Sequence, residues 1–277
     1  MFINKFLILL MNKIILIIII GILIIYYSFT PLLLYVYTIR YNHKYFNESN
    51  IRFSGTTPNI IFQTYYNKPN IPTYIYNNIK QFSSGYTHYI LDDNDCEYFL
   101  TKYYNSKVLK TFKELKKGAH KADLIRYCLL YIYGGYYMDI KTELILPMDI
   151  VFPNKNIMYT VLSETMIIKS IYQGIIATPP NNLLFIKLIN YIVERNNPIF
   201  YLDFCCDFYY QIYEDTNKVI TLGLNKGKIQ SYYIFNEECS IIDCSKCYDG
   251  FDKYHACCFV TDFNKPIIKM RRSSYPW

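Results

Sequence analysis

A long uncharged run near the N-terminus constrains this chain more than any other feature. Residues 14–39 contain no Asp, Glu, Lys or Arg, and residues 14–27 are dominated by Ile and Leu. Because about 20 apolar residues let a helix cross a bilayer, the run predicts a transmembrane anchor within residues 1–39. The alternative is a cleavable signal peptide, whose apolar region spans roughly 7–15 residues and ends at small residues. The uncharged run is longer than this, and no A-x-A-like cleavage site follows it, which favours an uncleaved anchor.

The rest of the chain divides into a polar stem over residues 40–57 and a folded domain over residues 58–277. The 277-residue sequence is 52% hydrophobic and 18% charged, a composition that excludes a disordered chain. Its net charge of +7 arises from basic residues scattered among acids, whereas a nucleic-acid binder gathers them in a stripe. We therefore expect no nucleic-acid partner.

The nine cysteines all follow the predicted anchor. A domain on the luminal side of a membrane could pair them as disulfides, whereas free structural thiols would suit a reducing compartment. Five residues near the C-terminus also have ligand types that zinc accepts: Cys244, Cys247, His255, Cys257 and Cys258. This set lacks a second C-x-x-C pair at the usual spacing, so we favour disulfides or free thiols over zinc.

Strand and helix patterns alternate at the start of the domain. We expect a strand over residues 59–64, a helix over 73–82 and a strand over 87–91. Acidic and amide residues at 92–95 then offer helix caps before an apolar-periodic stretch over 96–104. Such alternation predicts an α/β fold with a largely parallel sheet, whose ligands bind outside the carboxyl ends of the strands.

Residues 113–143 carry the strongest functional signal. A helical pattern begins after Gly118 and stops at a double glycine, residues 134–135, and a strand-like run follows over 136–140. From Asp123 to the end of this helix the rise is about 15 Å. The strand that doubles back from the glycines covers about 13 Å. Asp139 should therefore return to the level of Asp123.

Arg126 lies on the same helix face as Asp123, so an acid, a guanidinium and a second acid should converge. Such a group suits a polar, anionic ligand, because arginine grips phosphate oxygens and the acids accept hydroxyl hydrogen bonds or help to hold a divalent cation. Taken singly, an Asp–Arg pair is more often a surface ion pair and a double glycine a helix cap.

The combined spacing of residues 122–127, 130–131 and 134–139 resembles the DXD-containing sugar-binding region of glycosyltransferase family 32. Residues 58–64 and 89–93 resemble the first two strands of that family, and residues 174–180 resemble a family segment near the acceptor side. The resemblance implies a GT-A-type, Rossmann-like nucleotide-sugar domain. It also implies a retaining hexosyltransferase that uses a UDP- or GDP-linked donor and a glycan, lipid or protein acceptor.

The resemblance also implies roles for individual residues. Asp123 and Arg126 would bind the donor sugar, and Asp139 would contact ribose, sugar or a metal ion, Mn²⁺ or Mg²⁺. Further donor-site candidates are Gln63, Thr64, Asp93, Gly134 and Gly135.

The chain departs from the family pattern at Lys141, because Asp139-Ile140-Lys141 stands where the family has Asp-x-Asp. Two interpretations follow. The metal is held by the diphosphate, Asp139 and an acid from a later loop, or the Lys141 ammonium approaches the diphosphate itself and reduces the need for metal. The departure also leaves open a non-catalytic protein that binds glycan or nucleotide sugar, or that assists an active transferase.

Three other polar residues are weaker candidates. We interpret His120 as a solvated or capping residue, and we treat Glu164 and Asp203 as possible metal or acceptor groups. The resemblance favours a type II membrane topology with residues 40–277 in the secretory-pathway lumen.

Overall fold

The computed structural model describes residues 55–164, 168–195, 202–240 and 257–271. The chain divides into two units, Met1–Glu48 and Ser49–Trp277, and all of these ranges lie in the second. The predicted anchor and most of the predicted stem therefore lie outside the described residues. Within the described ranges, no helix combines the length and the apolar character needed to cross a membrane.

The first half of the domain alternates strands and helices as the sequence predicts. Its predicted strands at 59–64 and 87–91 and its predicted helix at 73–82 are confirmed as β1, β2 and α2. The elements, in order, are β1 (Ile60–Thr64), the 3₁₀ turn η1 (Lys68–Asn70), α2 (Thr73–Phe82), β2 (Thr87–Leu91), α3 (Asp93–Tyr103), α4 (Ser106–Glu114), α5 (Gly118–Tyr133) and β3 (Gly135–Met138).

Local chemistry sets the start of α3. The Asp92 carboxylate accepts a hydrogen bond from the Asp95 backbone N–H, and the Asp95 carboxylate accepts one from the Asp92 N–H. This reciprocal capping box satisfies two of the donors that a helix N-terminus leaves unpaired. Two of the acidic residues that follow β2 therefore cap the N-terminus of α3.

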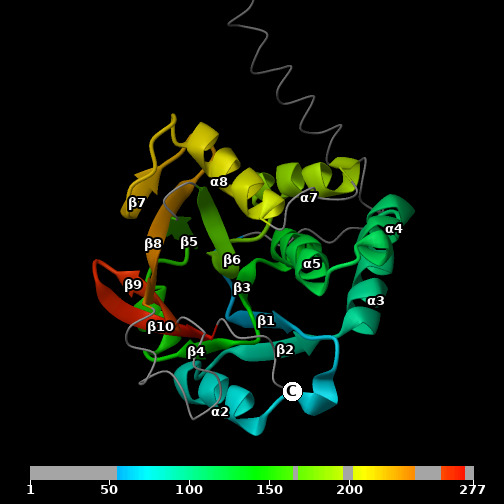
Figure 1. Ribbon diagram of the computed structural model, residues 1–277, viewed down its shortest axis with the longest axis horizontal. Helices are drawn as coiled ribbons and strands as arrows, with labels where there is room; N and C mark the ends of the chain where they lie inside the picture. Colours follow the sequence, from blue (N-terminus) through cyan, green and yellow to red (C-terminus); the bar gives the residue numbers. More distant parts are fainter. Residues whose placement is uncertain (1–54, 165–167, 196–201, 241–256, 272–277) are drawn as a thin grey trace, which may run out of the picture. The chain divides into compact units, whose positions relative to one another are not determined.

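The second half is richer in strands. Its elements are β4 (Thr142–Leu144), α6 (Met148–Val151), β5 (Met158–Glu164), β6 (Lys169–Thr178), α7 (Leu183–Arg195), α8 (Asp203–Asp215), β7 (Gly223–Lys226), β8 (Ser231–Ser240), β9 (Cys257–Asp262) and β10 (Lys265–Arg271). Figure 1 shows α5, α7 and α8 gathered on one side of the sheet and α2 on another.

The strands form one mixed sheet in the order β2-β1-β3-β6-β5-β8-β9-β10-β4, with β7 paired to β8. Parallel pairing joins β1 to β2, β1 to β3 and β5 to β8, and the other pairs are antiparallel. The prediction of a largely parallel sheet is therefore wrong. Antiparallel neighbours need only a short connection, and β9 and β10 are joined by a two-residue turn with positive φ at both residues. The α/β class itself is confirmed.

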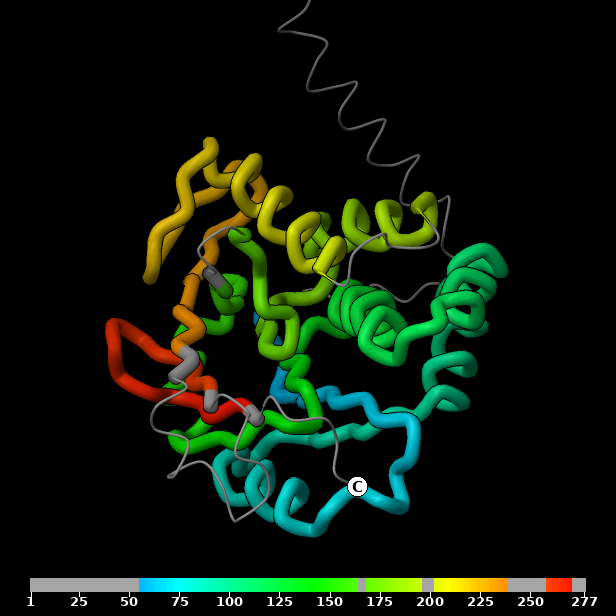
Figure 2. Tube along the Cα trace, in the orientation of Figure 1, coloured from blue at the N-terminus to red at the C-terminus, as the bar shows by residue number. Residues whose placement is uncertain are grey.

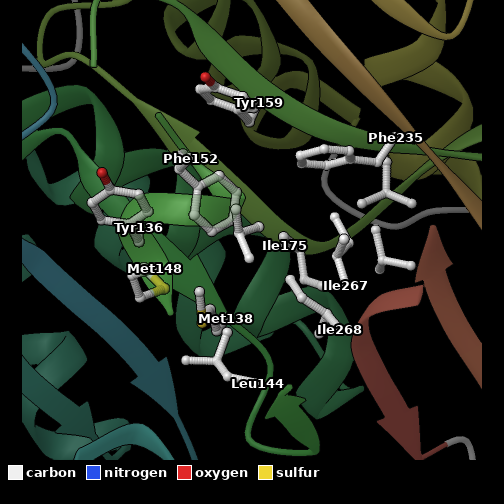
Figure 3. Close-up of a cluster of buried hydrophobic side chains, with 14 of the residues drawn as sticks. Tyr136, Met138, Leu144, Met148, Phe152, Tyr159, Ile175, Phe235, Ile267 and Ile268 are labelled. Atoms are coloured by element: carbon white, nitrogen blue, oxygen red, sulfur yellow. The ribbon is translucent and has the colours of Figure 1, made fainter. Parts of the chain in front are cut away.

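The sheet curls so that strands from both ends of its order enclose one hydrophobic core. Ile61 of β1, Leu144 of β4 and Ile268 of β10 belong to the same buried cluster. Figure 2 shows the red C-terminal strand running beside the green β4 segment, far from it in sequence. Aromatic rings fill the centre, where the Phe152 ring packs against those of Tyr136 and Tyr159 (Figure 3). Ile267 and Ile268 belong to the same cluster.

Candidate functional site

The candidate site lies where three parallel strands end. β1 ends at Gln63 and Thr64, β2 ends just before the α3 cap, and Asp139 follows β3. Because β1 pairs in parallel with both neighbours, these positions meet at one edge of the sheet. This is the edge at which open α/β sheets bind their ligands.

The double glycine lets α5 turn directly into β3. Gly134 and Gly135 have φ values of 65° and 92°. A Cβ atom on Gly134 would lie 2.5 Å from the Pro180 nitrogen, and one on Gly135 would lie 2.6 Å from the Ile60 carbonyl oxygen. Only glycine fits such close approaches with this backbone conformation, so both residues are required for β3 to return along α5.

Arg126 is the centre of the site. Its Nη2 atom lies 3.2 Å from Asp123 Oδ1 and 3.5 Å from Asp139 Oδ1. Its Nε atom donates to the Ala122 carbonyl, and its guanidinium lies 4.5 Å from the centre of the Tyr137 ring. The structure thus brings the two predicted acids and the predicted guanidinium together.

Burial differs sharply between the two acids. The side chains of Asp123 and Arg126 are 9% and 5% exposed, whereas that of Asp139 is 29% exposed. Burial raises the pKa of Asp123 to about 6; Arg126 opposes this rise, and Asp139 adds to it. Burial alone would lower the pKa of Arg126, but Tyr137, Asp123 and Asp139 together raise it. Arg126 is therefore a permanent cation, and Asp139 is the more exposed of the two acids.

The main chain of Asp139 is fixed on both sides. Its N–H donates to the Gly174 carbonyl at 2.8 Å, and its carbonyl accepts from the Gln63 amide Nε2 at 3.1 Å. Gln63 Oε1 in turn accepts from His88 Nε2 at 2.8 Å, so the histidine carries its hydrogen on that atom. Burial lowers the pKa of His88 to about 4, which keeps the ring neutral. The backbone of Asp139 is held, and its carboxylate remains partly open.

Thr64 contacts Tyr137, the tyrosine whose ring faces Arg126. The Thr64 hydroxyl lies 2.8 Å from the Tyr137 hydroxyl, and either can donate. The ring that faces the Arg126 guanidinium is thereby fixed from β1. Gln63 and Thr64, which the resemblance places beside the nucleotide, thus contact Asp139 and Tyr137.

Three consecutive residues of β6 that were not predicted as site residues contact the site or its neighbours. Tyr172 Oη lies 3.4 Å from Asp139 Oδ2, and Gln173 Oε1 accepts from the Tyr127 hydroxyl at 2.6 Å. Gly174 accepts from the Asp139 N–H, and a Cβ atom there would lie 2.7 Å from Asp139 Oδ2 and 2.3 Å from the Tyr172 ring. The only available signal was the family-like segment that begins at residue 174; the residues before it carry no local motif.

Two predicted donor-site residues lie in different surroundings. Lys141 is half-buried two residues after Asp139; burial lowers the pKa of its ammonium, and Asp139 opposes that change. Asp93 forms an ion pair with Lys121 of α5 at 2.6 Å. Within the described part of the chain, no hydrogen bond or ion pair joins Asp93 to the Arg126 group.

The weaker candidates lie on three elements, α5, α8 and β5. His120 is buried against the Phe204 ring of α8, so the interpretation of a solvated residue is wrong. Asp203 begins α8, 4.0 Å from Arg195, and Glu164 ends β5.

One of the five residues with zinc-ligand types is not available to a metal ion. Cys258 is disulfide-bonded and so cannot supply a thiolate to zinc. The side chains of the other four lie outside the described residues. Cys258 therefore belongs to the disulfide alternative of the sequence analysis.

One carboxylate is suited to a divalent cation. The described residues contain no group of three or more His, Cys, Asp and Glu side chains arranged for a metal. Magnesium, however, is commonly held by one or two carboxylates together with substrate phosphates and water. The partly exposed Asp139 fits such a shared ion.

One part of the chain matches a known protein family. Residues 40–160 match the family described as the glycosyltransferase sugar-binding region containing a DXD motif. The matched region is less than half of the chain, and over this part the chain is similar to that family. It includes α5, the double glycine and Asp139, and it ends within β5, so β6 lies beyond it.

A second similarity is shorter. Over 66 residues the chain is 35% identical to the initiation-specific α-1,6-mannosyltransferase of Candida albicans. The matched segment is 23% of this chain and 17% of that protein. The chain thus matches only a small part of this relative.

Proposed function

We propose that this protein is a retaining glycosyltransferase that moves a hexose from a UDP- or GDP-linked donor to a glycan, lipid or protein acceptor. One observation carries the proposal: Arg126 lies between Asp123 and Asp139 at the carboxyl ends of parallel strands, within the family-matched region. The name of the Candida relative makes mannose the first donor sugar to test.

The buried pair suits the recognition of a sugar. Asp123 accepts hydrogen bonds from sugar hydroxyls when ionised, and Arg126 offers further donors beside it. Because both side chains are buried, their positions are already fixed before a ligand binds. Such preorganisation lets binding energy serve orientation of the donor.

The partly exposed Asp139 suits the diphosphate end of the donor. A bound Mn²⁺ or Mg²⁺ would neutralise charge on the leaving diphosphate, and Asp139 is the residue that would hold it. Lys141 places a further cationic group two residues away. Gln63 and Thr64, which fix Asp139 and Tyr137, would border the nucleotide.

Donor turnover by the purified full-length chain tests the proposal. It should be incubated with UDP- and GDP-hexoses, including the mannose donor, and release of nucleotide should be measured. We expect turnover on one donor and a loss of at least roughly 100-fold in Asp139→Ala, as for removal of a major electrostatic contact. Glu114→Gln, which neutralises an exposed acid on α4, should keep full activity. Equal activity in both variants would refute the assignment of Asp139.

The second candidate function is binding of a nucleotide sugar without transfer. Lys141 favours it, because lysine stands where a metal-binding carboxylate would be expected and a protonated lysine cannot ligate a cation. Calorimetric titration separates the two functions. Donor binding that depends on Arg126, without turnover on any acceptor, would support the binding protein.

We also propose a type II membrane protein, with the anchor in residues 1–39 and the domain in the secretory-pathway lumen. The uncharged run supports the anchor, and the disulfide at Cys258 suits an oxidising compartment. Glycosylation mapping in microsomes tests this topology. Asn47 and sequons engineered into exposed loops should be modified; unmodified sites together with a protected N-terminus would reverse it.

A further inference from the structure

Five large apolar side chains are exposed together around β7. Their exposed fractions lie between 37% and 65%, and they come from the segment around β7 and from the β9–β10 turn: Val219, Leu222, Leu224, Ile229 and Phe263. The two segments touch, because a Cβ atom on Gly223 would lie 3.1 Å from the Phe263 ring. Figure 1 shows β7 beside β8 at the margin of the sheet.

The exposure of Leu224 is built into the strand. Along β7 the glycine at 223 and Asn225 are buried, while Leu224 and Lys226 point outward. Asn225 is held inside by its own hydrogen bonds: its amide donates to the Thr221 and Gly223 carbonyls, and its oxygen accepts from the Thr221 N–H. A strand facing water would have the opposite arrangement, with leucine inside and asparagine outside.

Exposed lysines accompany these apolar side chains. Residues 216–236 contain Lys218, Lys226 and Lys228 but no Asp or Glu, and Lys265 lies two residues after Phe263. All four lysines are exposed. Among the described residues, no acid forms an ion pair with any of them. We call these four lysines and the five apolar residues the basic-apolar patch.

The acids next to the patch are engaged by internal partners. Asp215 is buried and accepts from the Tyr232 hydroxyl at 2.8 Å and from the Ile229 N–H at 3.0 Å. Asp262 accepts from the Tyr233 hydroxyl at 2.9 Å. Both carboxylates are thus held by neutral donors, and among the described residues neither forms an ion pair with a lysine of the patch.

We propose that the basic-apolar patch binds the interface of a phospholipid bilayer, with its apolar side chains among the upper acyl chains and its lysines on lipid phosphates. Exposed apolar residues ringed by lysine are typical of surfaces that lie in a membrane interface. Interfaces between proteins are instead depleted of lysine, which argues against a second copy on this face. The proposal does not rest on glycosyl transfer.

A tryptophan reporter in the full-length chain tests the proposal. The natural sequence has one tryptophan, so Trp277→Phe provides a background without any. In this background Phe263→Trp reports on the patch, and Tyr98→Trp, at a 73% exposed position on α3, is the matched control. Both proteins are mixed with vesicles whose phospholipids carry bromine on the acyl chains, and fluorescence quenching is measured. We expect strong quenching at position 263 and none at position 98.

Charge reversal then separates lipid binding from other contacts. With the natural lysines, the quenching at position 263 should be strongest in vesicles that contain an anionic lipid. Changing Lys218, Lys226 and Lys265 to Glu should remove this quenching. Changing Lys107, Lys110 and Lys116 to Glu alters the same charge elsewhere and should leave it intact. Circular dichroism checks that each variant folds. Equal quenching at positions 263 and 98 would overturn the proposal. Solvent shielding of the tryptophan at position 263 that rises with protein concentration, without quenching by bromine, would also overturn it and would indicate a contact between copies.

Discussion

At the scale of single residues, Asp139 and Lys141 set the chemistry of the site. The backbone of Asp139 is held by Gly174 and Gln63, and its carboxylate is partly exposed. Lys141 occupies the position of a second acid and keeps a charged group near it. Whether donor turnover needs a metal ion therefore depends on these two side chains, and substituting each of them tests it.

We expect EDTA to stop donor turnover and added Mn²⁺ to restore it. A cation held by Asp139 and the diphosphate needs no second carboxylate, since Mg²⁺-type sites commonly use only one or two. Lys141→Ala should then retain most of the activity when metal is present. Full activity in EDTA, together with an inactive Lys141→Ala protein, would show instead that the ammonium performs the cation's role.

Asp123 should make stability depend on pH in a defined window. Its pKa is raised from 3.8 to about 6 by burial, with Asp139 adding to the rise and Arg126 opposing it; Cys205 and Tyr127 also lie close. The folded state therefore binds more protons than the unfolded state between about pH 4 and pH 6, and stability falls as the pH rises through this window.

Asp123→Asn removes this titration. Relative to the variant, the natural protein should lose up to about 3 kcal/mol between pH 4 and pH 7, since each pKa unit corresponds to about 1.4 kcal/mol. Urea unfolding at several pH values measures the difference between the two proteins. Parallel stability curves would contradict a raised pKa at Asp123.

At the scale of elements, the sequence predicted what local patterns determine. The α5 helix, its stop at two glycines and the return of β3 follow from periodicity and from glycine's conformational freedom. These three features alone bring Asp139 back to Arg126. The role of β6 could not be predicted in this way, because its contacts join residues more than 30 positions apart and involve no recurrent spacing.

Gly174→Ala tests how β6 positions Asp139. The new methyl group would lie 2.3 Å from the Tyr172 ring and 2.7 Å from Asp139 Oδ2, so both side chains must move or the backbone must shift. We expect a fall in kcat of roughly 10-fold or more, with the protein still folded, because small displacements of a reacting group are costly. Gly118→Ala is the control: nothing lies within 4 Å of its added Cβ, and activity should be unchanged. Normal kcat in Gly174→Ala would show that Asp139 tolerates displacement.

At the scale of the whole domain, the order of the sheet could not be predicted from local patterns. A strand pattern indicates that a segment is extended and which of its faces is buried, but it does not indicate which strand pairs with it. β10 pairs with β4 across more than 120 residues of sequence, and this pairing brings the last strand of the sheet's order back toward the first strands. The largely parallel arrangement predicted from the first half does not continue beyond β3.

The amide of Asn78 connects α2 to the last strand of the sheet's order. Asn78 of α2 donates to the Leu144 carbonyl at 2.9 Å and accepts from the Leu144 N–H at 2.8 Å, so it ties the helix after β1 to β4. Asn78→Ala removes both hydrogen bonds and leaves two partly buried backbone groups to find water. This change should destabilise the domain by about 1–3 kcal/mol.

The adjacent exposed Asn77 provides the control, because Asn77→Ala changes the same residue type on the same helix without touching β4. Denaturant unfolding gives the free energies, and hydrogen exchange gives the location. Faster exchange in β4 and β10 of Asn78→Ala, with slow exchange retained in β5 and β6, would show that the amide holds the ends of the curled sheet together. Equal stability of the two variants would mean that the hydrophobic core shared by β1, β4 and β10 closes the sheet without it.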